Sequence, residues 1–171
     1  MDILSQFITR TPVWVWVLFV YLLMRGIKAR QPGDTTLLKT AIIPVLFTAW
    51  SLSDLLTLYG LAFDSAGLWL LGIAVGAAIG WSIVARYDIV ANRAAGTLHR
   101  PADYTLLPLL LVTFAIKYGF GVVASVSPDL LLQPGFRLAD LTLSGLFTGI
   151  FIGKFGRYVW IWNKAPAATI A

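Results

Sequence analysis

The sequence predicts an all-α, polytopic membrane protein with five transmembrane helices. Of its 171 residues, 58% are hydrophobic and only 12% are charged, whereas about a quarter of the residues in a typical soluble domain are charged. Five apolar segments also approach or exceed the roughly 20 residues that a helix needs to cross a bilayer. We therefore expect a single membrane domain over residues 1–171.

The five predicted helices follow one another at residues 11–27, 38–62, 66–85, 105–126 and 138–162. The first is the shortest, and Thr11 followed by Pro12 is typical of an N-cap and a first helical position. The longest connection is the loop 86–104, in which Ala95 and Gly96 favour a hairpin turn.

The distribution of lysine and arginine predicts the orientation. Nine of the thirteen lie at one side, in the first and third connections and at the C-terminal end, against Arg10 and Arg137 at the other. Because basic loops stay in the cytoplasm, we expect the N-terminus outside, the C-terminus in the cytoplasm and 86–104 as a cytoplasmic loop. The same bias accounts for the net charge of +5 without a nucleic-acid partner.

Two helices carry glycines at four-residue spacing. These are Gly72, Gly76 and Gly80 in the third helix, and Gly145, Gly149 and Gly153 in the fifth. Residues at this spacing share a helix face and let two backbones approach closely. The two triads lie at matching depth on parallel helices, so we expect them to pack on each other, within one chain or across a homodimer. A pore or ligand groove lined by glycine is the alternative.

Two charged residues fall in the middle of apolar helices. Lys117 lies ~20 Å and Asp54 ~21 Å from the cytoplasmic starts of their helices, at 1.5 Å per residue. Ser51 lies on the same face as Asp54, and Thr113 on the same face as Lys117. Because an isolated charge at the bilayer centre costs ~2.5–3.5 kcal/mol or more, we expect the two to form a buried ion pair between the second and fourth helices.

Three interpretations of these charges remain open: a structural ion pair, a polar site that relays protons or ions or anchors a charged substrate, and a Lys117 that snorkels to the surface. Two other charged residues have simpler explanations. Lys154 is close enough to the cytoplasmic end of its helix to snorkel, and Asp140 lies near the outer interface.

The composition excludes several kinds of chemistry. There is no cysteine, and His99 is the only histidine, so thiolate metal sites and bis-histidine haem ligation are excluded. No phosphate-binding loop or Ser-His-Asp set is present, so we predict no catalytic residue, metal or cofactor. Arg93, His99 and Arg100 are candidates for contact with anionic lipid headgroups.

Two stretches carry a family resemblance: "TPVWVWVLFVYL" at residues 11–22, and "RAAGTLHRPADYTLLPLLLVTFAIKYGFG" at residues 93–121. Pro12 with Trp14 and Trp16, "AGTLHRP" and "FAIKYG" are the most specific parts. The chain resembles an uncharacterised family of small bacterial inner-membrane proteins, a domain of unknown function. The resemblance implies a bacterial inner membrane and a five-helix fold, and carries no activity.

The functional expectation is a non-enzymatic integral membrane protein in the lipid bilayer. It is either a small transporter-like or channel-like protein with a polar site at Asp54 and Lys117, working as an oligomer, or an accessory or assembly subunit. In the second case its glycine-rich helix faces bind another membrane protein. An enzyme is the least favoured class, because no active site is apparent.

Overall fold

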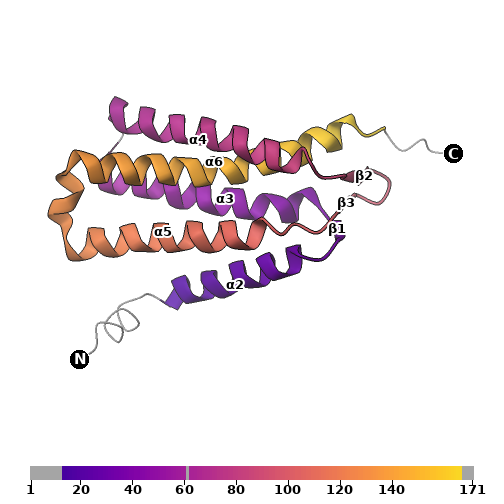
Figure 1. The fold of residues 1–171 in the computed structure, drawn as a ribbon, viewed down its shortest axis with the longest axis horizontal. Coiled ribbons are helices and arrows are strands. Elements are labelled where there is room, and N and C mark those ends of the chain that lie inside the picture. Colours follow the sequence, from indigo (N-terminus) through magenta and orange to yellow (C-terminus); the bar gives the residue numbers. More distant parts are fainter. Residues whose placement is uncertain (1–12, 61, 167–171) are drawn as a thin grey trace. The chain divides into compact units, whose positions relative to one another are not determined.

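The computed structural model describes residues 13–60 and 62–166 (Figure 1). The predicted helix start at Thr11 and Pro12 lies outside these residues. By their internal contacts the residues form two compact units, and each is described by itself. Within the described residues, the first comprises 13–32 and 102–118, and the second comprises 33–60, 62–101 and 119–166.

The first unit consists of α2 (Val13–Ala29) and the first part of α5 (Leu106–Val126). The backbone N–H of Asp103 donates to the carbonyl of Ala29 at 2.8 Å, which ties the end of α2 to the start of α5. Gly26 lies directly against Leu107, where a Cβ atom would approach the Leu107 side chain to 2.6 Å. The missing side chain thus lets the two helices approach closely.

The second unit is built around α6 (Pro134–Lys164). It also contains α3 (Leu37–Asp54), the π-helix η1 (Leu55–Tyr59), α4 (Phe63–Val84) and the short 3₁₀ helix η2 (Pro128–Leu132). In the most apolar stretch of α6, 56% of the residues are buried inside the protein, against 22% in α4. Figure 1 shows α4 alongside α6. Because α6 is the most buried of these helices, its side chains can contact residues from several neighbouring elements of the unit.

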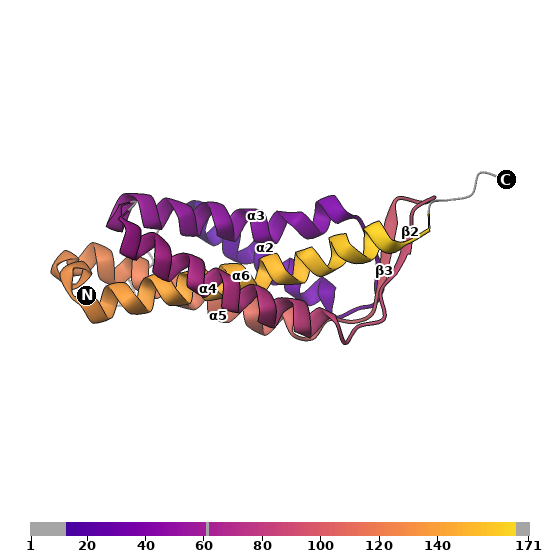
Figure 2. The same ribbon diagram turned by 90° about the horizontal axis from the view of Figure 1, so that it is seen from above.

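A small antiparallel sheet belongs to the same unit, in the order β1 (Gly33–Thr35), β3 (Thr97–Arg100), β2 (Val90–Asn92). The predicted turn lies between β2 and β3, and Gly96 has a φ of 68°, a conformation that glycine adopts readily. Leu98 of β3 packs with Val84 of α4 and Tyr158 of α6, and Figure 2 shows β2 and β3 beside the C-terminal end of α6. The all-α expectation missed this sheet, because strands of three or four residues are too short to show a hydrophobic period.

Four of the described helices are long and apolar enough to cross a membrane: Leu37–Tyr59, Phe63–Val84, Leu106–Val126 and Pro134–Lys164. They match four of the five predicted spans to within a few residues. The fifth predicted span is described over the 17 residues of α2, Val13–Ala29, and its first two predicted residues lie outside the described part of the chain. Large apolar side chains such as Leu71, Val75 and Ile79 are exposed on α4, which fits a lipid environment.

Candidate functional site

A line of polar side chains runs along one face of α6. Arg137, Asp140, Ser144 and Thr148 are spaced at i, i+3, i+7 and i+11, and positions at this spacing share a helix face. Each of them has a polar partner on a neighbouring element of the same unit. We call this set the polar column. It consists of Arg137, Asp140, Ser144 and Thr148 from α6, Ser51 from α3, Tyr59 from η1, and Ser65 and Trp69 from α4.

The column begins at the N-terminal ends of α4 and α6. Arg137 forms an ion pair with Asp64, with 2.9 Å between Nη2 and Oδ2, and the same nitrogen donates to the hydroxyl of Ser65. Ser65 is fully buried, whereas the side chain of Asp64 is mostly exposed. This end of the column therefore carries the charged groups that reach the protein surface.

One turn further along, a carboxylate is buried. Asp140 is 4% exposed, and its Oδ2 accepts a hydrogen bond from the phenol of Tyr59 at 2.9 Å. Asp54 and Arg137 also lie close enough to the Tyr59 phenol to act on it electrostatically. Tyr59 is the last residue of η1, which directly follows Asp54. Since π-helical turns inside membrane or soluble helices often occur at functional sites, this turn marks the site independently of the charges.

The middle of the column is a set of three side chains from three helices. The hydroxyls of Ser51 and Ser144 share a hydrogen bond of 2.9 Å, and the indole of Trp69 donates to the Ser51 hydroxyl at 2.6 Å. Ser51 and Ser144 are buried. Because these groups satisfy one another, α3, α4 and α6 are held in register at this level.

The column ends at a pair of stacked aromatic rings. The hydroxyl of Thr148 donates to the carbonyl of Phe47 at 3.5 Å. The rings of Phe47 and Phe151 lie 4.8 Å apart at an interplanar angle of 7°, and both side chains are buried. An apolar layer therefore closes the column roughly halfway along α6.

The predicted site at Asp54 and Lys117 is divided between the two units. Ser51 is part of the polar column and Asp54 lies beside it, whereas Thr113 and Lys117 belong to the first unit. Thr113 donates to the carbonyl of Leu109 in its own helix at 2.7 Å. Lys117 is 5% exposed, and both Lys117 and Asp54 interact with other groups. The ion pair between these two residues stays a prediction.

Lys154 differs from the expectation that it snorkels to the surface. It is 5% exposed and has an interaction partner inside the protein. The prediction was wrong because Lys154 lies on the face of α6 that packs inside the unit, together with the buried residues Ile150, Phe151 and Tyr158.

The glycine triads face each other within one chain. A Cβ atom on Gly76 would collide with the backbone of Leu146 and Ile150, and one on Gly149 would collide with the backbone of Ile73. Gly72, Gly80, Gly145 and Gly153 make the same kind of backbone contact along a parallel α4–α6 pair. This face of each helix is therefore occupied inside the monomer.

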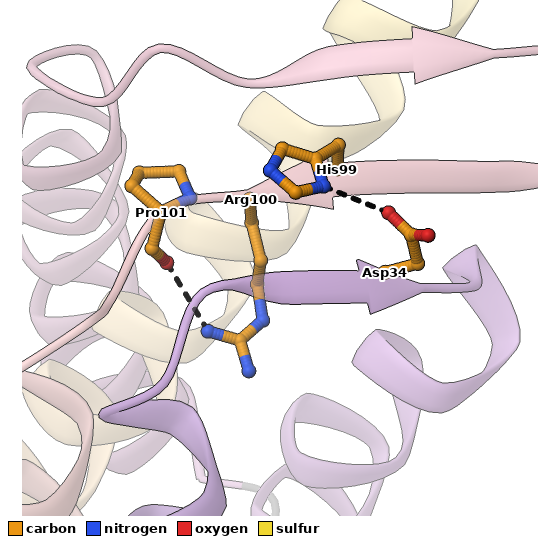
Figure 3. Close-up of polar contacts among 4 residues, drawn as sticks. All are labelled: Asp34, His99, Arg100 and Pro101. Atoms are coloured by element: carbon orange, nitrogen blue, oxygen red, sulfur yellow. Dashed lines mark hydrogen bonds and ion pairs between the residues drawn. The ribbon is translucent and has the colours of Figure 1, made fainter.

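The three residues predicted to contact lipid headgroups have partners inside the protein. Nδ1 of His99 lies 2.8 Å from the carboxylate of Asp34 on the neighbouring strand, as Figure 3 shows. Arg100 donates to the carbonyl of Pro101 at 3.3 Å. Arg93 donates to the carbonyls of Trp162 and Asn163 at the end of α6. These contacts order the sheet and the C-terminal end of α6.

The sequence interpretation assigned no role to Asp140, Tyr59, Ser144, Thr148 or Trp69. A signal for them was present in the spacing of polar residues along the fifth predicted helix, from Arg137 to Thr148. Trp69 of α4 donates a hydrogen bond to Ser51 of α3. The partner of a buried hydroxyl or carboxylate on another helix is a property of the packing, which the spacing does not contain.

A comparison with known protein families finds a match over nearly the whole chain. A family described as "Family of unknown function (DUF6622)" matches residues 2–168. Neither a curated protein nor a solved structure matches the chain. The site must therefore be interpreted from its own chemistry.

Proposed function

We propose a proton-handling role for this chain, which belongs to the family of unknown function DUF6622. In this proposal it is a small, non-enzymatic, transporter-like or channel-like membrane protein. The polar column is its conducting site, and Asp140 is the group that takes up and releases the proton. The buried carboxylate of Asp140 with its Tyr59 partner is the observation that carries the proposal.

The chemical groups of the column are suited to the transfer of protons rather than to the transport of a larger ion or substrate. A carboxylate, a phenol and three hydroxyls follow one another along α6, and each can accept a proton on one side and donate one on the other. Ionisable residues inside membrane helices commonly mark proton or ion pathways. In our proposal these groups pass the proton from one to the next without an open pore.

The Phe47–Phe151 layer supports a gated pathway. Hydrophobic constrictions in channels gate by excluding water, and this layer follows directly after Thr148. Beyond it on α6 lie the buried polar residues Lys154 and Tyr158. In our proposal the stacked rings separate a polar half-pathway on each side and must move for a proton to cross.

The proposal is tested by proton flux into proteoliposomes that carry a pH-sensitive dye inside, driven by a potassium–valinomycin potential. We expect Asp140→Asn to lower the flux on the order of a hundredfold, because a positioned proton-transfer group contributes about this much or more. Asp129→Asn is the matched control, since Asp129 is exposed in η2 and outside the column. It should leave the flux unchanged.

Two outcomes would overturn this proposal: an Asp140→Asn variant that keeps the flux of the wild type, or a wild-type protein that shows none above empty vesicles. The thermal unfolding midpoint of each variant in detergent separates a lost pathway from a lost fold. Tyr59→Phe keeps the ring and removes only the phenol that donates to Asp140, so an intermediate flux is expected from it.

An accessory or assembly subunit is the second candidate function. It is favoured by small residues on the exposed face of α4, where Ala74 and Ala78 lie four residues apart and would allow close approach of another helix. The glycine triads are engaged inside the monomer, so a homodimer or a larger membrane complex would form through this other face. Absence of wild-type flux would favour this function.

We further propose that the C-terminus lies in the cytoplasm, in a bacterial inner membrane, as the bias of nine basic residues to one side supports. A C-terminal alkaline phosphatase fusion should be inactive and a C-terminal green fluorescent protein fusion should fluoresce. The same reporters fused at residue 62, between η1 and α4, should give the opposite pattern. Phosphatase activity from the C-terminal fusion would contradict this orientation.

A further inference from the structure

The C-terminal end of α6 carries two cations held on tryptophan rings. The guanidinium of Arg157 lies 4.2 Å from the ring centroid of Trp160 and 5.2 Å from that of Trp81. The ammonium of Lys164 lies 4.7 Å from the centroid of Trp160. We call these four residues the cation–indole cluster. The rings fix both cations by cation–π attraction.

Within residues 13–60 and 62–166, the positive charges of the cluster have no carboxylate partner. Among the described residues, neither Arg157 nor Lys164 has a carboxylate within ion-pair distance. The buried Nε of Arg157 also has no hydrogen-bond acceptor within this part of the chain. Arg93, at the same end of the unit, donates to two carbonyls. The cluster thus holds two ordered cations that, as far as the described residues go, remain available to an external anion.

The position of the two cations fits one anion of phosphate size at a membrane surface. Arg157 and Lys164 are seven residues apart, so their Cα atoms lie two turns, ~10 Å, apart along one helix face, and their cationic groups lie 4.2 and 4.7 Å from the centroid of the same Trp160 ring. Tryptophans gather at the level of the headgroups, and arginine binds phosphate through paired N–H donors.

We propose that the cation–indole cluster binds the headgroup phosphate of an anionic phospholipid from the leaflet that surrounds the C-terminal end of α6. The indoles of Trp81 and Trp160 lie against the upper acyl chains, while Arg157 and Lys164 contact the phosphate. This site is separate from the polar column and does not depend on proton handling.

Native mass spectrometry of the full-length protein in detergent tests the site. The wild type should retain one phosphatidylglycerol in preference to phosphatidylcholine. Each cation near an anionic surface contributes roughly fivefold, so Arg157→Gln with Lys164→Gln should weaken the preference on the order of thirtyfold. Arg86→Gln is the matched control, because Arg86 is exposed near the same end. It should keep the preference.

Equal retention of the two lipids by the wild type, or an unchanged preference in the double variant, would overturn the proposal. If the double variant does not fold, Lys164→Gln alone in the exposed last turn should lose roughly fivefold. Inorganic phosphate is the second arm. If millimolar inorganic phosphate displaces the bound phosphatidylglycerol, the site binds a soluble phosphate, and the proposal of a lipid ligand is overturned.

Discussion

Gly76→Ala is expected to destabilise the protein, and Gly67→Ala on the same helix is expected to stabilise it slightly. A Cβ atom on Gly76 meets the backbone of Leu146 and Ile150, whereas one on Gly67 meets nothing within 4 Å. Backbone atoms cannot rotate away, so α4 and α6 must separate, at a cost of about 1–3 kcal/mol or more. At position 67 the added methyl group meets no neighbour, so the only effect is the higher helix propensity of alanine, which stabilises the helix by up to about 1 kcal/mol.

The two variants are expected to change the stability in opposite directions, so the comparison tests the α4–α6 contact and not the general effect of replacing a glycine. Thermal unfolding in detergent, followed by circular dichroism, should show a lower midpoint for Gly76→Ala and an equal or higher one for Gly67→Ala. Gly149→Ala should resemble Gly76→Ala, because its Cβ would strike the backbone of Ile73. Equal midpoints for all three variants would mean that the close approach of α4 and α6 is absent in detergent.

Lys117→Met is the second change with a large expected effect. If Lys117 and Asp54 form the pair predicted from their matching depth, removal of the lysine leaves a carboxylate without its partner. Breaking a buried ion pair costs about 3–5 kcal/mol, and we expect the lower end because Asp54 is only half-buried. Adding Asp54→Asn should restore part of the lost stability, because it removes the unpaired charge.

A double-mutant cycle provides the measurement, with unfolding midpoints for the wild type, both single variants and the double variant. Coupling above about 0.5 kcal/mol indicates a direct interaction. Additive effects would remove the pair from the description of this protein. In that case the buried Lys117 would be held by other groups of the first unit.

The sequence predicted most of the helical architecture, for reasons that are local. The four described spans are apolar helices of more than 20 residues, and the connections between them contain prolines, glycines and charged residues. The N-cap of α3 illustrates this, since the Thr36 hydroxyl accepts from the backbone N–H of Lys39 at 3.3 Å. Such features need only neighbours along the chain, so they can be recognised without a tertiary structure.

The candidate site was predictable only in part. Ser51 and Asp54 were singled out because polar groups in an apolar helix are conspicuous. Asp140 was passed over because its distance from the helix end resembled that of an interfacial residue. Its burial depends on Tyr59, which the π-helical turn η1 brings to it. A π-turn shifts the register of a helix by one residue, and it cannot be recognised from the hydropathy of the sequence.

By itself, the sequence determined that this is a membrane protein, where its helices lie and which helix faces carry glycine. These properties follow from composition and from the helical period. Only the tertiary structure decided that the two glycine faces meet inside one chain, that Ser51 pairs with Ser144, and that Asp140 is buried beneath Tyr59. Those outcomes depend on which helices become neighbours, and helix neighbours are chosen by the fit of whole faces rather than by any single residue.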